Sequence, residues 1–77
     1  MSDIHELNAR RLLCPLPVIR TQERIKELST GDLLRVVCTD PGVKHDIPAW
    51  CRLHGHEVIS LEDEDSQITL TIKVLTA

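Results

Sequence analysis

The sequence predicts a two-layer α/β (α+β) sandwich, in which two helices cover one face of a four-stranded mixed sheet. Patterns typical of strands and helices alternate in the order βαβαββ, and only a short acidic segment separates the last two strand patterns. Right-handed crossover connections then place both helices on the same face. A chain of 77 residues has room for one small core, so residues 1–77 are expected to form a single domain.

The first half of the chain predicts a strand, a helix and a second strand. Ile4–Asn8 has the length of a short strand. Over Pro15–Leu28, Val18 and Ile25 follow helical spacing, and charged side chains occupy the other side. The run Leu33–Cys38 is almost unbroken in its apolar character, which is typical of a buried central strand.

The second helix is expected to begin after a turn. Asp40 followed by a proline is typical of a helix start, but Pro48 lacks the amide N–H that a longer helix would need. We therefore expect a turn over residues 41–45 and a helix over Asp46–His54, with Pro48 in its first turn. Gly55 is the expected C-terminal stop.

The C-terminal part of the chain predicts a hairpin. Val58–Leu61 is expected to be a strand, Glu62–Asp65 a solvated turn and Gln67–Val74 the last strand. The last segment alternates cleanly between apolar and polar residues, so its two faces can be assigned. The residues expected to face inward are Ile68, Leu70, Ile72 and Val74, and those expected to face outward are Thr69, Thr71 and Lys73.

Composition limits the classes of partner. The core must be aliphatic, because the chain has one tryptophan and neither phenylalanine nor tyrosine. A net charge of −3 and the lack of aromatic stacking groups argue against binding to nucleic acid, so protein partners are expected. No secretory signal is visible, no apolar run approaches the roughly 20 residues of a membrane span, and an odd number of cysteines does not suggest a disulfide framework. We therefore expect a cytoplasmic protein without membrane contact, in which a free thiol survives.

Cys14 is the leading candidate for a functional residue. It lies directly before the first helical pattern, where free N–H groups and the helix dipole favour a thiolate. Pro15 fits the first helical position, and Pro17 still lies in the first turn, where a missing N–H breaks no helical hydrogen bond. The alternative is that Cys14 is a small buried hydrophobic residue. A proline-stiffened helix start favours the reactive thiol.

Other residues are placed close to Cys14 by the predicted topology. Arg10 and Arg11 in the preceding loop bring two cations that would lower the pKa of the thiol and stabilise a sulfur anion, unless they are only solvated loop charges. The exposed first turn of the helix and the Asp40 loop can form one docking surface for partners. Its expected members are Leu16, Ile19, Arg20 and Asp40.

The motif Cys14-Pro15-Leu16-Pro17 resembles the CPxP motif of the TusA-like (SirA-like) sulfur-carrier proteins. The similarity extends from about Leu7 to Val74 and departs from the family where Asn8 replaces the usual Asp and Arg11 the usual Gly. Arg11 implies that this loop either does not need a positive φ or tolerates the strain. The further landmarks of the resemblance are Leu7, Ala9, Arg10 and Leu12 before the motif, and Gly31, Asp32, Asp40, Pro41, Asp46, Ile47, Pro48, Trp50 and Cys51 after it.

The resemblance implies a two-layer sandwich and a sulfur carrier or sulfurtransferase without a cofactor. Cys14 would accept sulfane sulfur as a persulfide from a cysteine desulfurase or a rhodanese, and pass it to an acceptor protein. The pathway would be tRNA thiolation, molybdenum-cofactor supply or cytoplasmic sulfur oxidation. Because a carrier must present its thiol to several partners, a monomer is expected.

The sequence also leaves other interpretations open. Cys51, His54 and His56 are compactly spaced, but no fourth ligand is evident, so no metal site is expected. Cys38 and Cys51 are assigned to packing. A second function class is a thiol-containing regulatory or interaction module that moves no sulfur. A third is RNA binding, by analogy with translation factors of similar fold, which the acidic composition disfavours.

Overall fold

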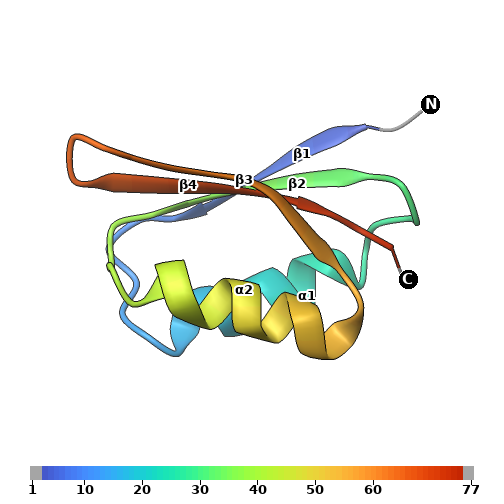
Figure 1. Ribbon diagram of the computed structural model, residues 1–77, viewed down its shortest axis with the longest axis horizontal. Coiled ribbons are helices and arrows are strands. Elements are labelled where there is room, and N and C mark those ends of the chain that lie inside the picture. The colour runs from blue at the N-terminus through green and yellow to red at the C-terminus, as the bar shows by residue number, and fades with distance from the viewer. Residues whose placement is uncertain (1–2, 76–77) are drawn as a thin grey trace.

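The computed structural model describes residues 3–75, which form a helix layer against a sheet layer (Figure 1). Both helices lie on the same face of the sheet, as the sequence predicts. The chain runs through β1 (Ile4–Ala9), α1 (Leu16–Ile25), β2 (Leu33–Cys38), α2 (Val43–His54), β3 (Glu57–Glu64) and β4 (Gln67–Lys73). None of the helices within these residues is both long and apolar enough to cross a membrane.

The sheet has the strand order β1-β2-β4-β3. β1 is parallel to β2, with Ala9 opposite Cys38, whereas β4 is antiparallel to both of its neighbours. The β1–α1 loop, the β2–α2 loop and the β3–β4 turn therefore meet at one end of the molecule, at the left of Figure 1. The two ends of the described chain lie at the opposite end.

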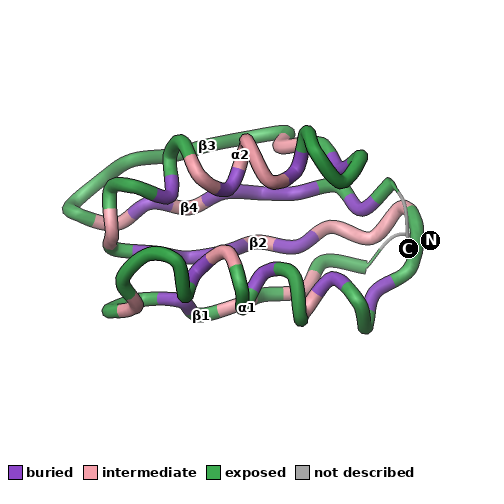
Figure 2. The backbone as a smooth tube through the Cα atoms, turned by 90° about the horizontal axis from the view of Figure 1, so that it is seen from below, coloured by how far each residue is buried: buried purple, intermediate pink, exposed green. Residues whose placement is uncertain are grey.

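The core between the layers is aliphatic, as expected. Most residues of the central strands β2 and β4 are buried or half-buried, and these strands lie beneath α1 and α2 (Figure 2). Thr21 on α1 is also fully buried. Its hydroxyl group is not left without a partner there, because it donates a hydrogen bond to the Pro17 carbonyl at 2.8 Å. The largest apolar members are Leu34, Val36, Val43, Ile47, Leu70, Ile72 and Val74.

The first helix is shorter than predicted. It begins at Leu16, so Pro15 occupies the N-cap position and Pro17 takes a position in the first turn; the expectation that Pro15 is the first helical residue is wrong. The Cys14–Pro15 peptide bond is cis. The helix ends at Ile25, and the chain continues in tight turns that still bury Leu28.

The second helix is longer than predicted. It begins at Val43 instead of Asp46, so most of the expected turn over residues 41–45 is helical and Pro48 lies inside the helix. The helix tolerates Pro48 because the proline costs only one intrahelical hydrogen bond and the packing of Ile47 and Cys51 in the core offsets it. Gly55 ends the helix with φ 78°, as expected.

The hairpin strands also differ from the prediction. β3 extends to Glu64, so most of the acidic run predicted as a turn is strand, and the turn consists of Asp65 and Ser66 at φ 52° and 62°. Charged residues are accommodated in β3 because it is an edge strand and exposed. One of them, Asp63, pairs with Lys44 of α2 at 2.7 Å.

Candidate functional site

The Cys14 thiol lies in the β1–α1 loop and is exposed, which contradicts the alternative that it is a buried core residue. Cys38 and Cys51 are free thiols as well, but both are buried, in agreement with their assignment to packing. Burial raises the pKa of each of these two thiols to about 11. Of the three cysteines, Cys14 is therefore the one that a partner can reach.

Asp40 fixes the backbone around the thiol. Its Oδ2 accepts a hydrogen bond from the Cys14 amide at 2.9 Å, and its Oδ1 accepts one from the Gly42 amide at 3.0 Å. These two donors, Gly42 first, lower the pKa of the Asp40 carboxyl. Asp40 thus joins the β1–α1 loop to the β2–α2 loop, and its predicted proximity to Cys14 is confirmed.

Asp46 holds the sulfur itself. The Cys14 thiol donates a hydrogen bond to Asp46 Oδ2 on the first turns of α2, at a distance of 3.1 Å between Sγ and Oδ2. This hydrogen bond, followed by desolvation and by Asp40, raises the pKa of Cys14 to about 12. The helix start was predicted to favour a thiolate, whereas the carboxylates of Asp46 and Asp40 act in the opposite direction and favour the thiol.

Gly42 provides the space for the sulfur. A Cβ atom at this position would lie 3.1 Å from Cys14 Sγ and 3.5 Å from Asp40 Oδ1. Gly42 is the N-cap residue of α2. The thiol therefore packs closely against the start of the second helix as well as preceding the first.

The hydrogen bonds that the structure gives Arg10 and Arg11 do not involve Cys14. Arg10 Nε donates a hydrogen bond to Gln67 Oε1 on β4 at 2.9 Å, and the backbone N–H of Arg11 donates to Thr39 Oγ1. Arg11 has φ 67°, so the loop keeps the positive φ and tolerates the strain of a side chain there.

The expected docking surface is partly apolar. Leu16 and Ile19 lie on the first turns of α1 and are each more than two-fifths exposed. Leu13, next to the thiol in sequence, is even more exposed and was missed by the sequence interpretation. Arg20 borders a shallow groove with Leu7 of β1.

The sequence interpretation also missed Asp46 and Gly42 as neighbours of the thiol. In the sequence, Asp46 stands out only as part of a family-like stretch and as the first residue of the shorter helix expected there. Because α2 begins at Val43, Asp46 lies inside its first turns and its side chain reaches back to Cys14. The sequence feature that could have indicated this site is the acidic pair Asp40 and Asp46, which lie six positions apart on the segment that follows β2.

His54 and His56, which were not expected to bind a metal, lie next to Trp50. The rings of His54 and His56 stack with Trp50 at centroid distances of 4.5 and 5.5 Å. His56 Nδ1 accepts a hydrogen bond from the Leu75 amide, and Cys51 is buried in the core. The surroundings of these residues thus agree with structural roles.

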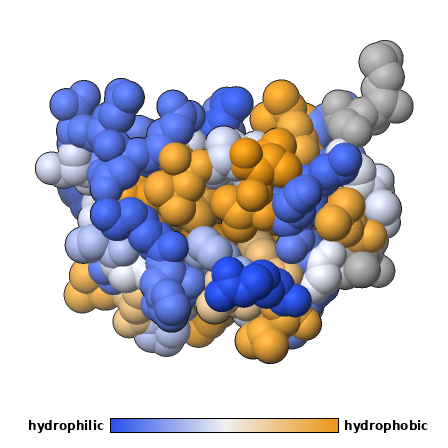
Figure 3. All heavy atoms as spheres, viewed as in Figure 1, coloured by the Kyte–Doolittle hydropathy of each residue, from blue (hydrophilic) through white to orange (hydrophobic). Residues whose placement is uncertain are grey.

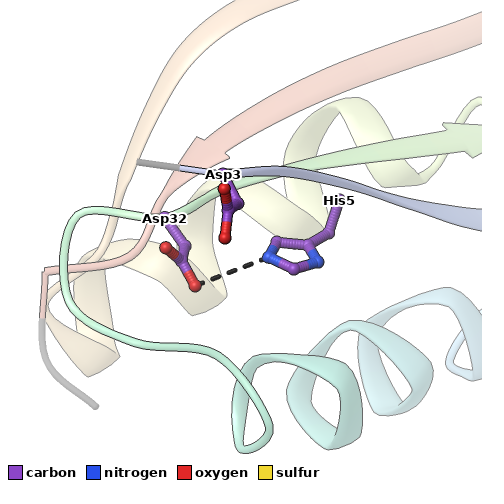
Figure 4. A group of neighbouring side chains, drawn as sticks. All are labelled: Asp3, His5 and Asp32. Atoms are coloured by element: carbon purple, nitrogen blue, oxygen red, sulfur yellow. Dashed lines mark ion pairs between the residues drawn. The ribbon is translucent and has the colours of Figure 1, made fainter. Parts of the chain in front are cut away.

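A different set of possible metal ligands lies at the far end of the sheet, near the start of β1. Asp3, His5 and Asp32 point toward one another (Figure 4), and one ligand atom from each lies within 4.8 Å of the others. His5 Nε2 is 3.5 Å from Asp32 Oδ2, and the Ser29 amide is the main cause of the lowered pKa of Asp32. The Ser29–Asp32 hydrogen bond closes the loop before β2, and the His5 contact ties that loop to β1.

Comparisons with known proteins agree with this geometry. A family model described as "Sulfurtransferase TusA" matches residues 5–74. The chain is 41% identical over 58 residues to the putative sulfur carrier protein YrkI of Bacillus subtilis, covering 75% of this chain and 77% of that protein. It is 37% identical over 68 residues to the sulfur carrier protein TusA of Pseudomonas syringae, covering 88% and 81% of the two chains.

A solved structure shows the same fold. The crystal structure of a SirA-like protein from Desulfitobacterium hafniense superimposes with a TM-score of 0.81 and 21% sequence identity, covering 95% of this chain and 99% of that one. The family match spans both segments that build the thiol site, from the loop of Cys14 to the helix of Asp46. The chain belongs to the TusA family.

Proposed function

We propose that the protein is a sulfur carrier that holds sulfane sulfur as a persulfide on Cys14. The observation that carries the proposal is the position of this thiol: it is exposed, while the hydrogen bond from its amide to Asp40 and the two flanking helix starts hold it in place. Partners of different shape can therefore approach one atom from outside. The names of the curated relatives support the same role.

The transfer is an exchange between sulfur atoms. The Cys14 sulfur loses its proton and bonds to the terminal sulfur of a donor persulfide; the bond between the two donor sulfurs breaks, and the donor cysteine leaves as a thiolate that takes up a proton. In the second step an acceptor thiolate attacks the terminal sulfur on Cys14, and Cys14 leaves. Neither step needs an external oxidant or a resident cofactor.

Protein partners are the proposed donors and acceptors. A cysteine desulfurase or a rhodanese would supply the sulfur, and the exposed apolar side chains of Leu13, Leu16 and Ile19 provide contact area beside the thiol. The acceptor would serve tRNA thiolation, molybdenum-cofactor supply or sulfur oxidation. We propose a cytoplasmic monomer, which fractionation of cells and elution at monomer size in size-exclusion chromatography would test.

The direct test is intact-mass spectrometry after incubation with a cysteine desulfurase and cysteine. Wild-type protein should gain about 32 Da, one sulfur, and a reducing agent should remove it. Cys14→Ser should abolish the gain, whereas Cys38→Ser and Cys51→Ser, wherever they fold, should retain it. Loading should also be unchanged by a metal chelator, because no metal takes part.

The main alternative is an interaction module that binds a partner without moving sulfur. No mass gain with either a desulfurase or a rhodanese donor, together with partner binding that survives Cys14→Ser, would contradict the carrier and favour this module.

A further inference from the structure

The thiol of the free protein is bound to a carboxylate rather than to a cation. Sγ of Cys14 lies 3.1 Å from Asp46 Oδ2, and Asp40 holds the same residue through its backbone amide. A thiol can donate this hydrogen bond, whereas a thiolate beside Asp46 would meet a like charge and lose the bond. The geometry therefore favours the form of cysteine that is not nucleophilic.

The cations closest along the chain form no ion pair with Asp40 or Asp46 within residues 3–75. Lys44, on the same helix as Asp46, is paired with Asp63 at 2.7 Å. Arg10, on the loop before the thiol, is bound to Gln67. Arg11 is on the same loop, but no ion pair within residues 3–75 involves Asp46.

The backbone N–H groups at the start of α2 are also occupied. Gly42 donates to Asp40 Oδ1, Val43 to the Asp40 carbonyl and Lys44 to the Pro41 carbonyl. A sulfur anion at this helix start would therefore find these donors already in use. These three amides at the start of α2 therefore offer no free N–H to a thiolate.

We propose that Asp46 is a positioning residue that keeps Cys14 in the thiol form in the free carrier, and that partners free the thiolate by placing a lysine or arginine side chain beside their reacting sulfur to pair with Asp46. The inference rests on the proposed sulfur-carrier function and deepens it by naming the chemistry of the partner surface. A cation pairing with Asp46 removes the hydrogen-bond acceptor of the thiol and neutralises the nearest negative charge.

The hydrogen bond from Cys14 to Asp46 is available to the empty carrier and not to the loaded one. Once the terminal sulfur is bonded to Cys14, Sγ carries no proton and cannot donate to Asp46. The same residue also affects release, because Cys14 must leave as a thiolate when an acceptor takes the sulfur, and a thiolate beside an unpaired carboxylate is a poor leaving group. A partner cation would thus promote both steps, and sulfur loss to other thiols would be slow.

The first test measures how fast iodoacetamide alkylates Cys14 as a function of pH, with the modified residue identified by mass spectrometry. Asp46→Asn should shift the pH profile to lower pH. Each unit by which the pKa falls should raise the rate at pH 7.5 about threefold, because the tenfold gain in thiolate is partly offset by lower nucleophilicity. Glu57→Gln, which removes the same charge at the opposite end of the sheet, is the matched control and should leave the profile unchanged.

The second test measures charge preference with methanethiosulfonate reagents. The Cys14 thiolate displaces methanesulfinate and forms a mixed disulfide with the reagent's thioalkyl group. Wild-type protein should react faster with the trimethylammonium-ethyl reagent than with the sulfonato-ethyl reagent, each measured relative to free cysteine. Asp46→Asn should reduce this ratio about fivefold, the size expected for one charge acting over a few ångströms of partly aqueous surroundings.

These outcomes separate the inference from the function on which it rests. An unchanged or alkaline-shifted profile in Asp46→Asn, or an unchanged charge preference, would overturn the role of Asp46 even if wild-type protein still gains one sulfur from a donor. Conversely, a protein that gains no sulfur but shows both effects would retain the role of Asp46 and lose the carrier function. A thermal unfolding curve of Asp46→Asn establishes that the variant is folded before either rate is interpreted.

Discussion

At the scale of single residues, Asp40 and Asp46 divide the control of Cys14 between them. Asp40 binds the backbone of the loop through two amides, whereas Asp46 binds the sulfur. The two carboxylates therefore have different tests. Substituting Asp46 should change the reactivity of the thiol, and substituting Asp40 should change the stability of the fold around it.

Asp40→Asn should lower the stability of the folded protein at neutral pH, because the amide side chain offers one oxygen where two backbone donors need acceptors. The pKa of Asp40 is lowered by folding, so its contribution is present above its unfolded pKa of about 3.9 and is lost as the pH falls through the folded value. The stability difference from wild type should therefore narrow between pH 7 and pH 3. Urea denaturation followed by the fluorescence of Trp50, the single tryptophan, measures it.

Asp65→Asn in the β3–β4 turn removes the same charge and serves as the matched control. A stability difference for Asp40→Asn that is the same at pH 3 and pH 7 would contradict the structural role of the carboxylate.

At the scale of elements, α2 decides the geometry of the site. It begins at Val43, three residues earlier than the sequence suggested, and it carries Asp46 at its start and Cys51 in the core. Its N-terminal end meets the thiol, and its C-terminal end stops at Gly55 before the edge strand β3. The missing N–H of Pro48 favoured a later helix start in the prediction. The burial of Val43 and Ile47 against the sheet stabilises the longer helix.

Gly55→Ala should destabilise the protein by about 1 kcal/mol, because Gly55 has φ 78° at the end of α2 and a side chain is strained in that region. Chemical denaturation measures the free energy of unfolding. Gln22→Ala on the exposed side of α1 is the control and should change stability by less than about 0.5 kcal/mol. Equal effects of the two substitutions would argue against a left-handed C-cap at Gly55.

At the scale of the whole molecule, stability comes from one aliphatic layer between the helices and the sheet. Apolar side chains also occur on the surface: Figure 3 shows them among hydrophilic ones on the face viewed in Figure 1. Several exposed leucines, among them Leu53 at 83%, add little to the core. Substituting a leucine should therefore lower the free energy of unfolding strongly in the core and only slightly on the surface.

Leu70→Ala should cost about 2–5 kcal/mol of unfolding free energy, because Leu70 is fully buried in β4 and its loss leaves a cavity. Leu53→Ala on α2 is the matched control and should cost less than about 0.5 kcal/mol. Thermal and urea unfolding of the two variants provides the measurement. A small cost at Leu70 would mean that the core packs differently from the arrangement described.

The amino-acid sequence by itself determined the order of the elements, the aliphatic core and the candidate residue for the chemistry. These follow from local periodicity, from the lack of large aromatic residues and from a cysteine placed before a helix, all of which are readable along the chain. The tertiary structure alone decided which side chains surround the sulfur of that cysteine. Asp46 lies 32 residues from Cys14 and reaches it only because α2 starts early and packs beside the β1–α1 loop. A hydrogen bond between side chains so distant in sequence depends on packing across two loops. That packing places a carboxylate, which favours the thiol, beside a sulfur for which the helix start alone had predicted a thiolate.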